Sequence, residues 1–262
     1  METVVKNLTE YISEIQKINV AASSSKHLFY RGVKDRAYQL IPKIYRDTKF
    51  KERDIVLDYK HYSPQTGANY NFPKDILKML ADMQHYGVPT RLLDWTTSPF
   101  VALYFACQDK NNQDGKIYIF NTWKYWRGII VEMTVADLHE IHIKARALSS
   151  LYKNFSDVQE KIQQEFNFQL TEDLLQKPFP FVSSFCNDRI INQKGCFTIH
   201  GQCRDSLDSQ QTEEISELII LDKHKSKILD ELNMFGIDDY SIFPDFEGMK
   251  KSFERKGSLF NL

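Results

Sequence analysis

The chain has 262 residues, of which 42% are hydrophobic and 13% aromatic, which is enough apolar material for one large soluble domain. Its 34 Lys and Arg residues nearly balance 35 Asp and Glu residues, which gives a net charge of -1. This balance excludes a general electrostatic attraction to nucleic acid or anionic membranes, but not a local patch of positive charge. No apolar run approaches the roughly 18 residues of a membrane span, and the acidic start lacks the core of a signal peptide. We therefore expect one cytoplasmic domain over residues 1–262 that makes no membrane contact.

Cysteine and histidine give no metal pattern. The cysteine spacings match neither a C-x-x-C pair nor a zinc knuckle, so we expect reduced structural thiols at Cys107, Cys186, Cys196 and Cys203. His139 and His142 form an i, i+3 pair without acidic partners, and His200 stands alone. We expect no bound metal.

The first third of the chain predicts a helix, a strand and two further helices. Residues 1–20 are predicted to form a leading amphipathic helix, because aliphatic residues recur there at helical spacing: Val4, Val5, Leu8, Ile12, Ile15 and Ile18. The sequence HLFYR, residues 27–31, alternates as a strand that places Leu28 and Tyr30 on one face and Phe29 and Arg31 on the other. The stretch from 51 to 85 favours two helices.

A buried helix is predicted next. Ser98 followed by Pro99 is typical of a helix start, with serine as the N-cap and proline at the first helical position. The sequence FVALYFAC behind them is apolar on almost every side, so this helix is expected in the middle of the domain, with Phe105 fully buried.

The rest of the chain mixes short strands with helices. We predict strands at 116–121 and 128–133 joined by residues 122–127, a polar helical region over 137–168, and a strand or bulged hairpin over 189–201. Another strand at 215–222, a helix ended by Gly236 and a last short helix at 246–257 complete the pattern. Because strands lie between long helices without βαβ alternation, we predict an α+β domain with a mixed or mainly antiparallel sheet.

Common catalytic signatures are absent. The sequence has no P-loop, no G-x-G-x-x-G, no H-E-x-x-H and no G-x-S-x-G. The segment HYGVPTRLLDWTTSP, residues 85–99, instead gathers a histidine, an arginine and an aspartate with the hydroxyl run Thr96, Thr97 and Ser98, which stands just before the buried helix. Free N–H groups at a helix N-terminus, hydroxyls and a guanidinium are the parts of an anion-binding site.

A purely structural explanation of this segment is equally consistent with its spacing. Ser98 is then only a helix cap, Asp94 forms a buried ion pair with Arg91, and Trp95 belongs to the core.

Four stretches of the sequence resemble the FRG domain family, a bacterial and phage-associated group named for its (Phe/Tyr)-Arg-Gly start. These are FYRG at 29–32, QHYGVPTRLLDWTTSPFVALYFA at 84–106, RIINQKGCFTIHG at 189–201 and KILDELNMFGIDDYSIFPDFEGMKK at 227–251. They occur in the family's order and span most of the chain. The family resemblance alone implies no particular activity.

The order of these features is also similar to the layout of ADP-ribosyltransferases, in which an early Arg and a Ser/Thr turn hold NAD and a late Glu, in E-x-E or Q-x-E, promotes departure of nicotinamide. This resemblance implies that Arg31 binds the pyrophosphate or the nicotinamide ribose of NAD. It implies that the turn residues line the nicotinamide side of the pocket, and that a tyrosine stacks on a ring. The residues implied are Thr96, Thr97 and Ser98 for the turn and Tyr30 or Tyr86 for the ring.

The expected glutamate is missing. Gln193 falls where the Q-x-E strand is expected, but position 195 is glycine. Because positive charge builds on the ribose as nicotinamide leaves, another carboxylate is needed near that carbon, and Asp94 is the best local candidate. Arg91 is then either the partner of Asp94 or a phosphate ligand, and His85 is an acid/base, a ribose ligand or simply a packing residue.

Two functions compete on these grounds. The first is an NAD-using ADP-ribosyltransferase-like enzyme, a toxin or phage-defence effector that modifies an unknown macromolecular target or hydrolyses NAD. The second is a non-catalytic module that binds a nucleotide or a phage component in the same pocket. A nuclease is disfavoured by the balanced charge and by the lack of a metal-carboxylate cluster.

Overall fold

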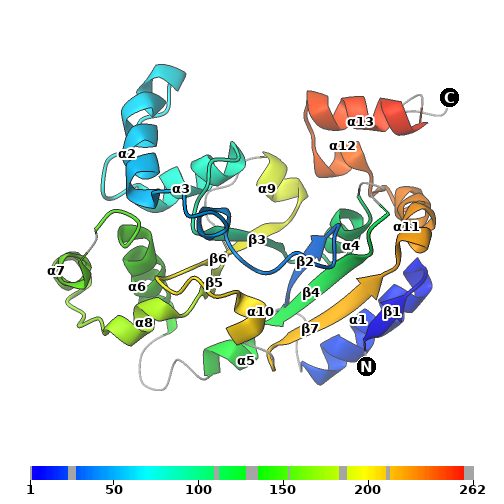
Figure 1. Cartoon of the computed structure of the whole chain (residues 1–262), viewed down its shortest axis with the longest axis horizontal. Helices are drawn as coiled ribbons and strands as arrows, with labels where there is room; N and C mark the ends of the chain where they lie inside the picture. The colour runs from blue at the N-terminus through cyan, green and yellow to red at the C-terminus, as the bar shows by residue number, and fades with distance from the viewer. Residues whose placement is uncertain are drawn as a thin grey trace.

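The computed structural model describes residues 2–22, 28–108, 112–127, 135–152, 154–182, 188–210 and 213–256. Within these residues the strands form one seven-stranded sheet in the order β1-β7-β4-β2-β3-β6-β5 (Figure 1). In that order the strands span Thr3–Val5, Ile215–Ile220, Gly115–Asn121, Leu28–Val33, Leu92–Thr96, Gly195–Ile199 and Phe179–Phe181. β1 pairs in parallel with β7 and every other pairing is antiparallel, so the predicted α+β fold with a mixed sheet is confirmed.

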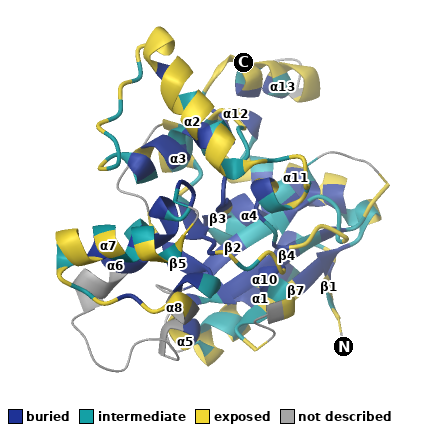
Figure 2. Ribbon diagram, turned by 60° about the vertical axis from the view of Figure 1, so that its left-hand side comes forward, coloured by how far each residue is buried: buried dark blue, intermediate teal, exposed yellow. Residues whose placement is uncertain are grey.

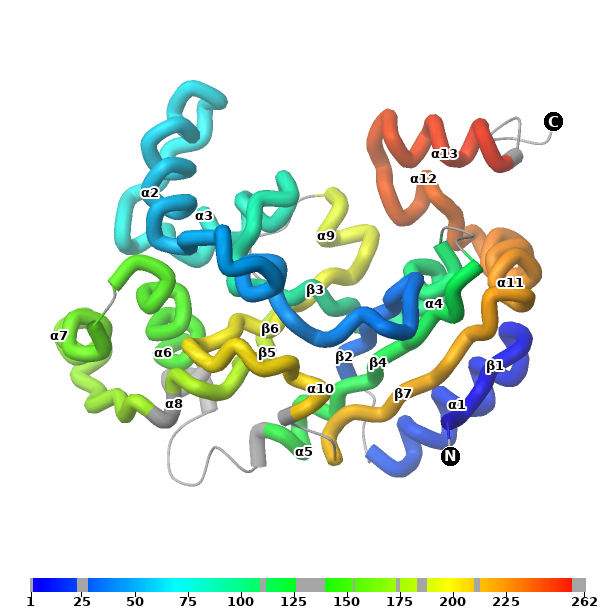
Figure 3. The backbone as a smooth tube through the Cα atoms, viewed as in Figure 1, coloured from blue at the N-terminus to red at the C-terminus, as the bar shows by residue number. Residues whose placement is uncertain are grey.

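Helices flank this sheet and occupy its ends (Figures 1 and 3). They are α1 (Leu8–Ala21), α2 (Glu52–Tyr62), α3 (Ile76–His85), α4 (Pro99–Cys107), α5 (Thr122–Arg127), α6 (Val135–Leu148), α7 (Phe155–Phe166), α8 (Glu172–Gln176), α9 (Asp188–Asn192), α10 (Leu207–Gln210), α11 (Asp222–Met234), α12 (Asp239–Ile242) and α13 (Phe246–Lys256), with short 3-10 turns η2 (Lys43–Tyr45) and η3 (Ser63–Thr66). In the described part of the chain, no helix is both long and apolar enough to cross a membrane.

The two faces of β2 follow the predicted alternation. Leu28 and Tyr30 pack in a core cluster with α1, α4 and α11, whereas Phe29 and Val33 belong to a second cluster on the opposite face. A third cluster joins α3, α6 and α7 to β5 and β6 at the far end of the sheet. Figure 2 shows the buried strands at the centre, with α2 mostly exposed.

The start of the chain differs from the prediction. Residues 3–5 form β1 instead of the first turn of a helix, and Thr3 is paired with Leu218 of β7. The helix begins only at Leu8, after Asn7, whose side chain accepts a hydrogen bond from the Glu10 amide at 2.9 Å. Two adjacent valines fit either period, and the open edge of β7 selects the strand.

Other predicted elements are shifted or confirmed. Residues 122–127, expected as a plain connection, form α5, and residues 188–192, expected in a strand, form α9 ahead of β6. The predicted strand at 128–133 lies outside the described residues. α11 ends as expected before Gly236, whose φ of 74° suits a residue without a Cβ.

The buried helix is where the sequence predicts it. α4 starts at Pro99 after Ser98, and its residues Val101–Tyr104, Ala106 and Cys107 are buried. Its backbone lies directly on β2, because a Cβ built on Gly32 would come 1.8 Å from the carbonyl oxygen of Ala102. Gly32 therefore sets the distance between the strand and the helix.

Candidate functional site

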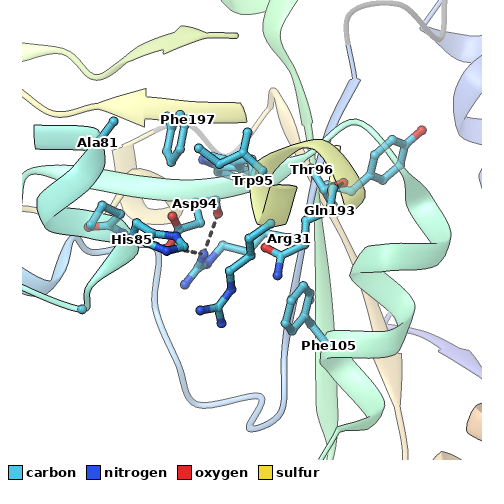
Figure 4. Close-up of a pocket in the computed structure, with 15 residues that line it drawn as sticks. Arg31, Ala81, His85, Asp94, Trp95, Thr96, Phe105, Gln193 and Phe197 are labelled. Atoms are coloured by element: carbon cyan, nitrogen blue, oxygen red, sulfur yellow. Dashed lines mark hydrogen bonds and ion pairs between the residues drawn. The ribbon is translucent and has the colours of Figure 1, made fainter. Parts of the chain in front are cut away.

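A pocket of about 380 Å³ opens where β2, β3 and the turn between α9 and β6 meet (Figure 4). Its size is within the range of about 300–1,000 Å³ that is usual for small-molecule sites. Its walls combine aromatic rings with a few polar groups. Its lining residues include Arg31, Gln84, His85, Asp94, Phe105 and Gln193.

The pocket lies beside a gap in the sheet. β2 and β3 are paired only at Tyr30 and Thr96, so Gly32 and Asp94, which would face each other in a continued ladder, are not paired. Arg31 Nη1 instead donates a hydrogen bond to the Asp94 carbonyl oxygen at 2.5 Å. The guanidinium therefore links the two strands where their ladder stops.

The Arg31 side chain lines the pocket and is only partly exposed. Its side chain is 19% exposed, and Nη1 lies 4.0 Å from the carboxylate of Asp94. Burial lowers the pKa of Arg31 below its ordinary value, while the charge of Asp94 acts in the opposite direction. Among the described residues, buried Nε has no hydrogen-bond acceptor. An unpartnered N–H in a buried position is costly, and an anion in the pocket would satisfy it.

The Asp94 carboxylate is held from the other side. Gln84 donates from its amide to Asp94 Oδ2 at 2.8 Å, and its own oxygen accepts from the Thr90 hydroxyl at 2.6 Å. Thr90 is fully buried, whereas the Asp94 side chain is 55% exposed. The carboxylate is thus oriented by one amide while it stays accessible to a ligand.

Thr96 and Gln193 connect the end of β3 to the turn before β6. The Thr96 hydroxyl donates to the Gln193 carbonyl oxygen at 2.6 Å and accepts from the Ser98 amide at 2.9 Å. The Gln193 side chain donates to the Ile242 carbonyl oxygen at 3.3 Å. These bonds bring three segments distant in the chain to one pocket wall.

The structure brings together part of the predicted site. Arg31, His85, Asp94, Thr96 and Gln193 line the pocket (Figure 4). Figure 4 shows His85 and Asp94 close to Arg31, with Phe105 and Gln193 on the far side.

Arg91 is not part of this pocket. Its guanidinium is buried against Glu52, with Nε and Nη2 donating to the two carboxylate oxygens at 2.7 and 2.5 Å. Nη1 donates to the Arg146 carbonyl oxygen at 3.0 Å and to the Ser149 hydroxyl at 2.5 Å. The expectation that Arg91 pairs with Asp94 or holds a phosphate is therefore wrong, because its donors are already used in the core.

Four further predicted residues do not present a side chain to the pocket as expected. The Tyr30 ring packs in the core, and its hydroxyl donates to Asn19 at 3.3 Å, although its residue borders the pocket. Tyr86 is 74% exposed and stands outside the lining. Thr97 and Ser98 also stand outside it, and Ser98 occupies the N-cap position without a side-chain cap bond.

Sequence reasoning missed several pocket residues. Gln84, Phe105 and Arg189 line it, and Phe105 is only partly buried, contrary to the expectation of full burial. The Arg189 guanidinium lies 4.5 Å from the centroid of the Phe243 ring. Gln84 and Phe105 lie in the stretch 84–106 and Arg189 in the stretch 189–201 that resemble the FRG family, but no local pattern indicated that their side chains meet.

The described histidines and cysteines considered above as metal ligands lie outside the pocket lining. His142 stacks on Phe179 with ring centroids 4.8 Å apart, and His200 is fully buried, while the side chain of His139 lies outside the described residues. In the described part of the chain, no three His, Cys, Asp or Glu side chains gather to bind a metal. The free thiols described are Cys107, Cys196 and Cys203, and Cys186 lies outside the described residues.

Comparison with known protein families gives one result. Residues 26–115 match the FRG domain. No curated protein and no solved structure matches the chain. The resemblance noted at 189–201 and 227–251 lies outside the matched residues.

The matched FRG domain holds the centre of the pocket. It includes β2, β3 and α4, and with them Arg31, Gln84 and Asp94. The Arg-Gly pair that names the family has two separate physical roles in this chain. Arg31 links two strands at the pocket, and Gly32 allows α4 to lie against β2.

Proposed function

We propose that the chain is an ADP-ribosyltransferase-like enzyme that binds NAD in the Arg31 pocket and breaks its bond between nicotinamide and ribose. The observation that carries this proposal is that Arg31 of β2, Thr96 of β3 and Gln193 in the turn before β6 line one pocket. This is the arrangement that the layout of that superfamily implies. The proposal extends to a toxin or phage-defence effector that modifies a macromolecule.

The reaction needs a carboxylate in the right place. The bond from the ribose carbon to the nicotinamide nitrogen breaks, its electron pair leaves with neutral nicotinamide, and positive charge develops on the ribose. Asp94, oriented by Gln84 and accessible, is the carboxylate to stabilise that charge. A lone pair of the acceptor or of water then forms the new bond, and His85 is placed to take the proton that the acceptor loses.

The walls of the pocket also suit a nucleotide. Trp95, Phe105 and Phe197 line it, which supports the binding of a flat ring beside the charged groups. Arg31 supplies a positive charge at the pocket wall for a phosphate oxygen.

NAD consumption by the purified chain tests the proposal. Asp94→Asn is expected to lower turnover by about 100-fold, as does loss of one charge-stabilising group in other enzymes. Arg31→Lys is expected to lower it by about tenfold, because a point charge replaces a planar fork. Arg53→Ala, at an exposed arginine of α2, is the matched control and is expected to keep full activity. Equal turnover by wild type and both pocket variants would refute the assignment.

A binding module without turnover is the second candidate. The observation that favours it is Gly195, which stands where the superfamily has its glutamate. Among the described lining residues, Asp94 is then the one carboxylate that could replace that glutamate. In that case NAD or a related nucleotide binds, Arg31→Lys weakens the binding, and no nicotinamide is released. If NAD is neither consumed nor bound at millimolar concentration, the NAD proposal is wrong.

A further inference from the structure

A second hollow of about 240 Å³ adjoins the pocket. The two share four lining residues, Arg31, Gln84, Gly87 and Asp94, so the Arg31–Asp94 pair is their common wall. On its other side the second hollow is lined by Lys43 and Arg46, together with residues 88, 92 and 93.

The side chains of Lys43 and Arg46 each donate a hydrogen bond to a backbone carbonyl oxygen and have further N–H donors besides. Lys43 Nζ donates to the Gly87 carbonyl oxygen at 2.8 Å, and Arg46 Nε donates to the Ile41 carbonyl oxygen at 2.9 Å. Lys43 is the first residue of the 3-10 turn η2 and Arg46 is its C-cap, and both residues line the second hollow.

Charge in this hollow is unbalanced. Three cations, Arg31, Lys43 and Arg46, line it beside one carboxylate, that of Asp94. The field of Arg46 reaches Arg31, because it adds to the effect of burial in lowering the pKa of Arg31 against the opposing charge of Asp94. An anion is the ligand that offsets such an excess of positive charge.

We infer that the second hollow is a phosphate subsite, in which Lys43, Arg46 and the guanidinium of Arg31 bind the pyrophosphate of a ligand whose sugar and ring lie in the larger pocket. The ligand's identity as a dinucleotide rests on the proposed function, whereas the phosphate chemistry rests on the cations. Lys43 and Arg46 are then residues for binding and not for bond breaking.

Inorganic pyrophosphate is the direct probe of this subsite. Its affinity for the full chain is measured by calorimetry for wild type and for the double variant Lys43→Ala/Arg46→Ala. We expect the double variant to bind about tenfold more weakly, and its affinity to depend less on salt, since two charge-assisted contacts are lost. Lys49→Ala is the matched control, because Lys49 is an exposed cation nearby that pairs with Asp47 at 2.8 Å and lies outside the lining.

A phosphate-free ligand separates the two pockets. Nicotinamide riboside is expected to bind the double variant and the wild type equally, while NAD binds the double variant about tenfold more weakly. Unchanged pyrophosphate affinity in the double variant, or no pyrophosphate binding by wild type, would overturn the subsite.

The outcomes also separate this inference from the proposed function. If the wild type does not consume NAD but the double variant binds pyrophosphate more weakly than the wild type, the enzyme proposal is rejected and the phosphate subsite is supported. If the double variant consumes NAD with an unchanged KM, the enzyme proposal is supported and the phosphate subsite is rejected.

Discussion

Replacing Gly32 with alanine tests the contact that sets α4 on β2. The added Cβ would lie 1.8 Å from the Ala102 carbonyl oxygen and 2.7 Å from the Ala106 amide nitrogen, both of them backbone atoms. Real Cβ contacts stay above 3.0 Å, so the helix and the strand must move apart by about 1.2 Å. Neither side can yield through a rotamer change, because both atoms belong to the backbone of a buried helix.

The expected cost is at the upper end of the overpacking range, about 3 kcal/mol of the free energy of unfolding, after a small gain from a stiffer unfolded chain. For a chain of this size that loss lowers the midpoint of thermal unfolding by about 6–12 °C. Differential scanning calorimetry measures it. Gly195→Ala is the control, because its Cβ would meet the flexible Ile190 side chain at 3.3 Å. A Gly32→Ala midpoint within about 2 °C of wild type would show that the close approach is not real.

Three more perturbations test other parts of the fold. Arg91→Met is expected to cost about 3–5 kcal/mol in urea unfolding, because it leaves the Glu52 carboxylate without its buried partner; a change below 1 kcal/mol would contradict this pairing. Burial lowers the pKa of His200 to about 3 from 6.5, so the unfolded chain binds the proton at a higher pH than the folded chain. The contribution of His200 to the free energy of unfolding is therefore complete above pH 6.5 and falls towards pH 3 by up to about 1.4 kcal/mol per pH unit. His200→Gln should show a shallower slope of stability against pH, and an identical slope would argue against a neutral buried imidazole. Phe105→Ala is expected to cost only about 1–2 kcal/mol, since the ring is partly buried, and a loss of 4 kcal/mol in urea would mean full burial.

The elements that the sequence predicted well are those whose signal is local. The apolar run of α4, with Ser98 and Pro99 before it, fixes both the start and the burial of that helix. The alternation of β2 likewise gives its two faces correctly. β1 was missed because its partner strand begins at residue 215, and three residues carry too little pattern to show which period they follow.

The site was harder to predict because it is built from distant contacts. Within the predicted segment, His85, Asp94 and Thr96 line the pocket, whereas Arg91, Thr97 and Ser98 do not. The sequence could not show which distant partners these groups have. Arg91 is next to the pocket strand in sequence, yet Glu52, 39 residues earlier, turns it into a core residue. Gln84 gained its role only through Asp94, which lies 10 residues later across a turn.

The gap between β2 and β3 gives arginine an advantage at position 31 that goes beyond its charge. Nη1 of the planar guanidinium links the two strands through the Asp94 carbonyl oxygen, and Nε keeps a donor that no described acceptor uses. A lysine ammonium carries its three N–H donors on one nitrogen, so the strand carbonyl and the ligand would both have to lie within about 3 Å of that single atom. The planar guanidinium spreads its donors over three nitrogens, so it can reach two acceptors that lie further apart.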